Sequence, residues 1–239
     1  MNTTTSIATT VSFKNWGEFF SSPVITALCQ ATPITGGIAS FITDTYQQQQ
    51  YETMQNFLHL LHSKVSTIES QYIDHEFLSS DEGQRIIGKV LRSVIRDNRK
   101  EKLQAMANLT GNLHTNRNLT INEKELYVDI LDTLNSLQLS ILEKAVKDMR
   151  ERIEPKHRGL GWEIIASHYQ KLGVSKPLVL QSIRTLESSG IVNQNTATIN
   201  QQDQTHFVTD FGEQFYDYIS DESLTKFNEQ KLIELGLKI

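Results

Sequence analysis

The stretch that decides the fold of the C-terminal part reads WEIIASHYQKLGVSKPLVLQSIRTLESSGIV (residues 162–192). Its apolar residues recur at three- and four-residue steps, which predicts helices over Trp162–Leu172 and Lys176–Ser189. The Ser175-Lys-Pro177 start supplies an N-cap and a proline in the first turn, where its missing N–H costs nothing. Gly190 stands where a helix end calls for a positive φ. The stretch therefore predicts a helix–turn–helix.

Short β-strands come after these two helices in the sequence. Ile191-Val192 and Thr205–Thr209 are apolar enough for strands. Asn193–Gln204, between them, contains no Pro or Gly to fix a tight turn, which favours a loose wing. A closing helix begins at Asp210 and places Phe211, Phe215, Tyr218 and Ile219 on one face. A helix–turn–helix followed by a two- or three-stranded β-wing is the pattern of a winged helix.

Two runs in this part resemble the winged-helix domains of bacterial and archaeal regulators. They are Leu186-Glu-Ser-Ser-Gly-Ile-Val192 and Phe207-Val-Thr-Asp-Phe-Gly-Glu-Gln-Phe215. In that family the recognition helix ends in a leucine–acid–x–x–glycine–apolar–valine run, and a threonine–x–x–glycine sequence opens the next helix. The resemblance implies that an outward helix face reads DNA, with Lys176, Gln181, Arg184 and Thr185 as candidate nucleic-acid-binding residues. Winged helices also dock proteins, so the partner is left as DNA or a protein.

The charge of the C-terminal part is unfavourable for DNA. Residues 151–239 carry nine basic and twelve acidic side chains, and Asn193–His206 contains no Lys or Arg. Neutralising several phosphates requires more cations than this, although a homodimer would double their number. We therefore expect a regulator, as a homodimer, that acts on DNA or on a protein.

The preceding part, residues 44–150, is predicted to be a helical domain, with its last helix as a candidate first helix of the C-terminal domain, residues 151–239. A long helix is indicated by the spacing of Met54 through Tyr72, and further helices are predicted over Asp81–Arg96 and Leu137–Arg150. Asn98 with Glu101, and Asn122 with Glu125, resemble capping boxes of two more helices. Thr110–Thr120 is predicted to be a loop, and Leu126, Ile130, Leu131 and Leu134 an inner helix face. The fold class is thus mainly α. The run Phe77-Leu-Ser-Ser-Asp-Glu, together with the helices after it, resembles uncharacterised bacterial proteins that join such helices to a winged helix.

Residues 1–43 are predicted to be a mobile end and an uncharged segment. No charged residue lies between Glu18 and Asp44, a length that would suit a membrane span. Pro23, Pro33 and the Gly36-Gly37 pair interrupt it, which favours a short helix and loop, with membrane contact as the alternative. The single Cys29 and the lack of a signal sequence predict a cytoplasmic protein.

A basic stripe is predicted on the Asp81–Arg96 helix. Its members are spaced by four, three and four residues and are Arg85, Lys89, Arg92 and Arg96. Two interpretations are open: an anion-binding face for phosphate, nucleic acid or a membrane, or a solvated face paired with acids on neighbouring helices.

Catalytic and metal-binding patterns are not found. His59, His62 and His75 are the nearest approach to a metal site, but no cysteine pair or HExxH spacing accompanies them. The chain contains no phosphate-binding glycine loop and no GxSxG elbow. We therefore predict a protein without enzymatic activity, metal or cofactor. A membrane-acting or protein-docking effector that uses the basic helix and the uncharged segment is the alternative function.

Overall fold

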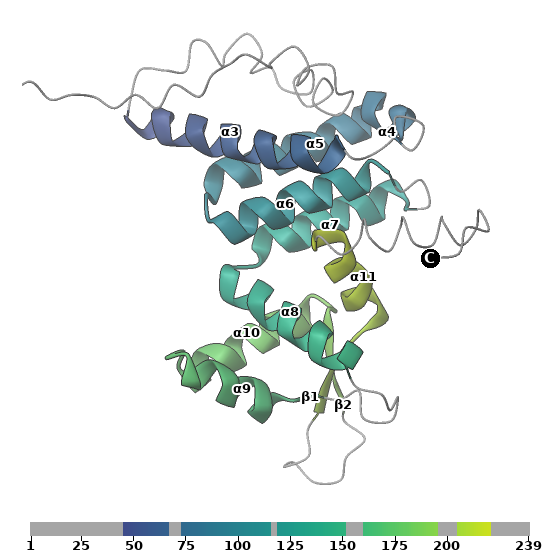
Figure 1. Cartoon of the computed structure of the whole chain (residues 1–239). Coiled ribbons are helices and arrows are strands. Elements are labelled where there is room, and N and C mark those ends of the chain that lie inside the picture. The colour runs from purple at the N-terminus through teal and green to yellow at the C-terminus, as the bar shows by residue number, and fades with distance from the viewer. Residues whose placement is uncertain (1–44, 67–72, 116–118, 152–159, 196–204, 221–239) are drawn as a thin grey trace, which may run out of the picture.

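A computed structural model describes residues 45–66, 73–115, 119–151, 160–195 and 205–220. Within these ranges the protein is mainly helical, as predicted (Figure 1). The elements are α3 (Thr45–Val65), α4 (His75–Ser79), α5 (Asp81–Arg96), α6 (Lys100–Leu113), α7 (Ile121–Thr133), α8 (Ser136–Glu151), β1 (Leu160–Gly161), α9 (Trp162–Lys171), α10 (Lys176–Ser188), β2 (Val192–Asn195), β3 (Thr205–Val208) and α11 (Asp210–Ile219). The uncharged segment Phe19–Thr43 and residues 221–239 lie outside the described residues.

Helices α3 to α7 form one packed body, with α3 lying across α5 and α6. The predicted α5 has the bounds expected from its sequence, and Ser80 caps it by accepting a hydrogen bond from the Gly83 N–H at 3.0 Å. Its apolar face is buried throughout, and so are the residues of α3 that face it. These residues include Phe57, Leu61, Ile86, Ile87, Val90, Leu91 and Val94.

Two predicted helix caps are wrong. Arg99, not Asn98, is the N-cap residue of α6, and its side chain makes no capping hydrogen bond. Thr120, not Asn122, caps α7, because a Thr-x-x-Glu capping box begins two residues earlier and satisfies the same backbone groups first. The N–H of Thr120 donates to the Glu123 carboxylate at 2.7 Å. Glu125, the predicted capping partner of Asn122, instead forms ion pairs with Arg85 and Lys89 of α5.

The predicted loop Thr110–Thr120 and the predicted inner position Leu126 are also corrected. Helix α6 continues to Leu113, because tertiary contacts supply what its Thr-, Gly- and Asn-rich end lacks in helix propensity. The Thr110 hydroxyl donates to the Met106 carbonyl at 2.6 Å, and the side chain of Asn112 binds α11. Leu126 is 46% exposed, while the next residue, Tyr127, is buried in its place.

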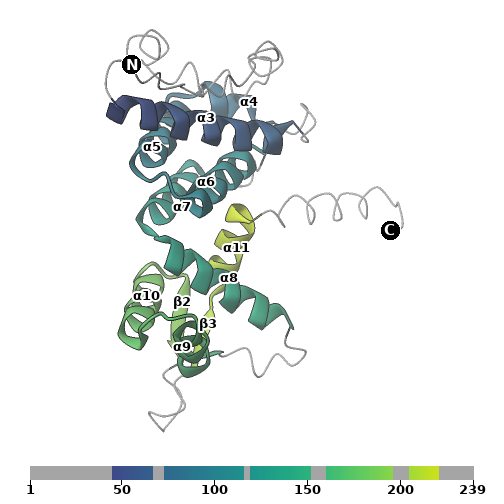
Figure 2. The same ribbon diagram turned by 60° about the vertical axis from the view of Figure 1, so that its left-hand side comes forward.

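The last described helix, α11, folds back from the sheet onto α6 and α7 (Figure 2). Tyr127 of α7 meets three aromatic rings of α11, and the centroid distances are 5.1 to 5.8 Å. Two buried α6 amides, of Asn108 and Asn112, donate to the carbonyls of Ile219 and Tyr218 at 3.0 and 2.7 Å. These bonds satisfy carbonyls that a helix end otherwise leaves unpaired. The body and the C-terminal part are therefore held together through α11.

The C-terminal part places α9 and α10 beside a small antiparallel sheet in the order β1-β3-β2. Val192 pairs with Val208, and Leu160 with His206. Helix α8 packs against α10, α11 and the sheet. The predicted positive φ at Gly190 is confirmed at 73°.

Gly212 fixes the approach of α11 to the sheet. Thr209 caps α11 through the Gly212 N–H at 2.9 Å, and its hydroxyl donates to the Gly190 carbonyl at 2.7 Å. An added Cβ at Gly212 would lie far inside contact distance of the Ile191 carbonyl. The threonine–x–x–glycine sequence therefore has a physical reason. The threonine caps the N-terminus of α11, and the glycine leaves room for the Ile191 carbonyl next to that cap.

Candidate interaction site

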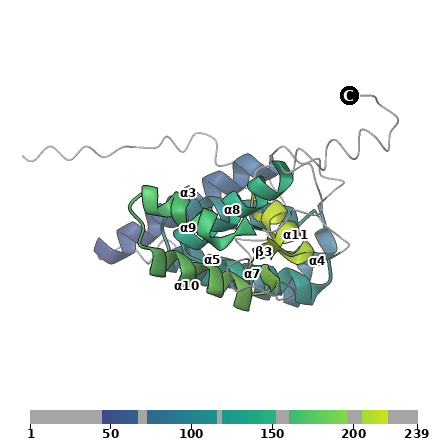
Figure 3. The same cartoon turned by 90° about the horizontal axis from the view of Figure 1, so that it is seen from below.

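Helix α10 has one buried face and one outward face. The predicted inner residues Val179, Ile183 and Leu186 are all buried, and so is Ser182. On the other side Gln181 and Arg184 are exposed, while Lys176 and Thr185 are half-buried. Figure 2 shows α9 and α10 together at the end of the molecule opposite α3, and the view from below in Figure 3 shows α10 along an outer edge. The four candidate residues thus lie on one accessible surface.

The polar groups of this surface differ in how far they are engaged. The Thr185 hydroxyl donates to the Gln181 carbonyl at 3.1 Å, so its hydrogen is already used within the helix. Within the described parts of the chain, the side chains of Gln181 and Arg184 make no hydrogen bond or ion pair. These two side chains can therefore bind a partner without first breaking a contact within the described residues.

The same end of the molecule carries exposed apolar side chains. The large hydrophobic residues that are exposed in the described ranges are Leu126, Ile164, Leu172 and Leu178. Three of the four belong to α9, its following turn and α10, and their exposed fractions are 55%, 65% and 51%. We call Ile164, Leu172, Leu178, Gln181 and Arg184 together the α9–α10 face. Exposed apolar residues concentrated on two contacting helices and the turn between them favour an interaction surface, whereas isolated ones are common everywhere.

Sequence reasoning missed the apolar part of the α9–α10 face, although a signal exists. Ile164 precedes Ile165, and Leu178 precedes Val179. Neighbouring positions on a helix point about 100° apart, so a narrow buried stripe cannot hold both members of such a pair. In each pair the structure buries the second residue and exposes the first.

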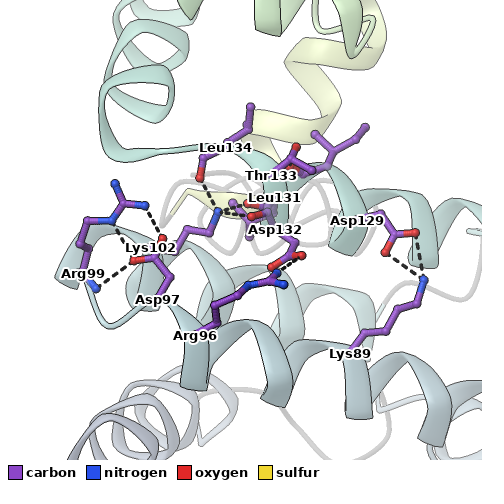
Figure 4. Close-up of polar contacts among 11 residues, drawn as sticks. Lys89, Arg96, Asp97, Arg99, Lys102, Asp129, Leu131, Asp132, Thr133 and Leu134 are labelled. Carbon is purple, nitrogen blue, oxygen red and sulfur yellow. Dashed lines mark hydrogen bonds and ion pairs between the residues drawn. The ribbon is translucent and has the colours of Figure 1, made fainter. Parts of the chain in front are cut away.

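The basic stripe of α5 faces acids on α7, which runs parallel to it. Arg85 donates to Glu125 at 2.7 Å. Figure 4 shows the other two pairs, Lys89 with Asp129 at 2.9 Å and Arg96 with Asp132. The hydrogen bond from Arg85, and to a smaller extent the one from Lys89, lowers the pKa of the Glu125 carboxyl to about 2. The acids of α7 are spaced by four and three residues, which the sequence could have matched to the stripe.

This pairing bears on the two interpretations of the stripe. Three of its four cations are engaged by carboxylates, as the interpretation of a solvated, paired face expects. Arg92 is exposed and has neither an ion pair nor a hydrogen bond to any residue in the described ranges. An anion would therefore meet one uncompensated cation here, and anion binding by the stripe stays a prediction.

A buried lysine caps the C-terminal end of α7. The Lys102 ammonium donates to the carbonyls of Leu131, Asp132 and Leu134, and the side chain is only 2% exposed (Figure 4). Burial lowers the pKa of Lys102 to about 8, and the carboxylates of Asp97 and Asp132 oppose this shift. A cation at a helix C-terminus stabilises the last carbonyls, so Lys102 has a structural role.

A second buried polar cluster joins α4, α6 and α7. The Lys124 ammonium lies 3.9 Å from the Phe77 ring centroid and 3.3 Å from the Asp74 carboxylate. His114 donates from Nδ1 to the Thr110 carbonyl, and within the described residues its buried Nε2 has no partner. Burial lowers the pKa of His114 to about 4 and also lowers the pKa of Lys124. Both side chains are almost fully buried, so they serve packing and not substrate contact.

The described ranges hold neither a metal site nor a membrane-spanning helix. No group of three His, Cys, Asp or Glu side chains there is arranged to hold a metal ion. None of the helices in these parts of the chain combines the length and the apolar character needed to cross a membrane.

Comparison of the chain with protein-family models, with curated proteins and with solved structures finds no match. The resemblance to winged-helix regulators therefore stays a prediction, and the α9–α10 face itself is the basis for a proposed function.

Proposed function

We propose that residues 160–220 form a winged-helix module and that the protein is a non-enzymatic regulator that binds another protein through the α9–α10 face. The order helix, turn, helix, strand, strand, helix supports the winged-helix assignment. The antiparallel pairing of β2 with β3 and the close approach at Gly212 support it further. The single observation that carries the proposal is the exposure of Ile164, Leu172 and Leu178 at one end of the molecule.

A protein partner fits this surface better than DNA does. Burying an apolar side chain that is half exposed gains on the order of 1 kcal/mol, and three such side chains on α9, its turn and α10 can anchor an interface. DNA offers phosphates and mostly polar base edges, with thymine methyl groups as the apolar feature, so exposed leucine and isoleucine gain less there than in a protein interface. The exposed Arg184 would add specificity at the edge of such an interface.

Site-specific photo-crosslinking in living cells tests this proposal. A photoreactive phenylalanine analogue replaces Leu178 in one variant and Leu126 in a matched control, because Leu126 is an exposed leucine on a distant helix. We expect one discrete protein adduct from position 178 that is absent from position 126 and weakened by Leu172→Ser. Equal adducts from both positions, or none from position 178, would overturn the proposal. An adduct of twice the chain mass of 27.2 kDa would identify a second copy as the partner.

DNA is the second candidate partner, because Gln181 and Arg184 are exposed and unengaged, within the described residues, on the outward face of α10. Both residue types recognise base edges. If DNA binds, fluorescence anisotropy with random duplexes at low salt should show binding that falls as salt rises. Arg184→Ala should weaken it more than Arg85→Ala, since Arg85 is already paired with Glu125. A nuclease-sensitive adduct from position 178 would likewise favour DNA.

A further inference from the structure

The sequence that carries the α9–α10 face is basic, although the chain as a whole is acidic. The stretch from Ile164 to Arg184 spans the whole face and contains no Asp or Glu. It holds three cations, Lys171, Lys176 and Arg184. The acids nearest to it along the chain, Glu163 and Glu187, lie just outside it. The net charge of the full chain is −5, so the charge of this stretch has the opposite sign.

Two of these cations are available to a partner. Lys171 is the last residue of α9, Arg184 lies on the outward side of α10, and both side chains are exposed. Neither makes an ion pair or a hydrogen bond with a residue in the described ranges. The basic stripe of α5 differs, because carboxylates of α7 engage three of its four cations. A partner of the α9–α10 face therefore meets positive charge that the described parts of the chain leave uncompensated.

Apolar and basic side chains alternate along both helices of the face. On α9, Ile164 and Lys171 are seven residues apart, so they lie on the same side of the helix, separated by about 10 Å along its axis. On α10, Leu178 and Arg184 are six residues apart, about 9 Å along the axis. A partner helix of three turns, roughly 16 Å long, is therefore long enough to reach an apolar and a basic side chain of either helix.

We propose that the α9–α10 face binds an acidic amphipathic segment of a partner protein. The apolar side chains of that segment cover Ile164, Leu172 and Leu178, and its carboxylates pair with Lys171 and Arg184. The inference rests on the proposed function, because it names the chemistry of the partner that this same face binds. The apolar contacts supply most of the affinity, and the opposite charge orients the segment and selects against basic partners.

Fluorescence anisotropy with labelled synthetic peptides tests this chemistry on the full-length protein. The probe is an amphipathic peptide with leucine at three- and four-residue steps and glutamate at its polar positions. One matched peptide has lysine in place of each glutamate, and a second has glutamine in place of each leucine. We expect the acidic leucine peptide to bind about tenfold more tightly than either matched peptide.

The direction of this preference is informative, because the net charge of the protein, −5, favours the lysine peptide in non-specific binding. Tighter binding of the lysine peptide would overturn the inference. Equal binding of the peptide without leucine would overturn it too, because the face would then recognise negative charge alone, as it would in binding nucleic acid.

Variants connect peptide binding with the named residues. Arg184→Gln should weaken the acidic leucine peptide about threefold, as expected for one surface ion pair. Leu178→Ser should weaken it about fivefold, because a half-exposed leucine loses its apolar contact. The matched controls are Arg92→Gln on α5 and Leu126→Ser on α7, which remove exposed side chains from helices away from α9 and α10 (Figure 2). Both controls should leave the affinity unchanged, and a loss as large as in the test variants would move the site away from the α9–α10 face.

Charge reversal in living cells separates this inference from the proposed function. With the photoreactive residue at position 178, Arg184→Glu should reduce the protein adduct, whereas Arg92→Glu should not. An adduct that survives Arg184→Glu undiminished would overturn the acidic partner and leave the protein-binding function in place. The absence of any adduct without the charge reversal would instead overturn the proposed function, and a nuclease-sensitive adduct would assign the face to nucleic acid and overturn both.

Discussion

Replacement of Lys102 by methionine should change how the stability of the protein depends on pH. Lys102 is buried and its ammonium meets three carbonyls at the end of α7. Burial lowers its pKa from 10.5 to about 8 in the folded state. Between these two values the unfolded chain holds a proton that the folded protein has lost, so raising the pH favours folding. Methionine has a similar length and does not titrate.

The expected magnitude is set by the two pKa values. Each pKa unit corresponds to about 1.36 kcal/mol, so the full shift amounts to roughly 3.4 kcal/mol. Below about pH 8 Lys102 is charged in the folded protein, so the full free-energy cost of burying its ammonium lowers the stability of the wild type. Between about pH 7 and about pH 9.5 the stability of the wild type relative to Lys102→Met should rise by about 2 kcal/mol.

Denaturation by urea, followed by far-ultraviolet circular dichroism at both pH values, measures this difference. Lys100→Met removes an exposed lysine from the same helix and measures the effect of losing one charge alone. A wild-type advantage that stays constant or falls with pH would refute the reasoning. It would mean that the hydrogen bonds to the α7 carbonyls fully offset the free energy that the Lys102 ammonium loses on leaving water.

Three further predictions concern single buried contacts. In His114→Phe the acid sensitivity should fall: burial lowers the pKa of His114 from 6.5 to about 4, so the wild type should lose about 2 kcal/mol relative to the variant between about pH 7 and about pH 5. Denaturant melts at both pH values check this, and a parallel loss in both proteins would contradict it. Asn112→Ala should cost about 1–3 kcal/mol by removing the donor to an α11 carbonyl, and Asn112→Asp should cost more because its oxygens repel that carbonyl. Thermal unfolding ranks the two, and the reverse order would count against the α6–α11 contact. Gly212→Ala should destabilise by about 1–3 kcal/mol because its Cβ meets a backbone carbonyl, whereas Gly88→Ala, with only a side-chain end at 3.4 Å, should be neutral or stabilising. Equal melting temperatures for the two alanine variants would remove the argument for a required glycine.

Local sequence signals predicted the elements whose structure depends on near neighbours. The bounds of α5, the inner face of α10 and the positive φ of Gly190 are all explained by periodicity and capping. The same reasoning misplaced the start of α7, because two overlapping sequences could form the capping box and only one does. It ended α6 too early, because the contact that holds Asn112 lies 106 residues along the chain.

The candidate site was predictable only in part. The outward position of Gln181 and Arg184 is set by helical phase, and the structure exposes both. The spacing of the α7 acids matches that of Arg85 and Lys89, but the pairing also requires that α5 and α7 are neighbours, which no local pattern establishes. The burial of Lys102 is of the same kind. A lysine is normally a surface residue, and only the assembled helix end gives its ammonium three acceptors.

The return of α11 onto α6 sets the order in which the chain can mature during synthesis. The amide of Asn108 binds the carbonyl of Ile219, 111 residues later. At translation rates of about 5–20 residues per second, roughly 5 to 20 s separate the emergence of these two groups. During that interval Tyr127 lacks the aromatic rings of α11, and the nascent helices display an apolar surface. A chain whose synthesis stalls before Asp210 would therefore expose this apolar surface and bind chaperones, and it would not be a stable domain.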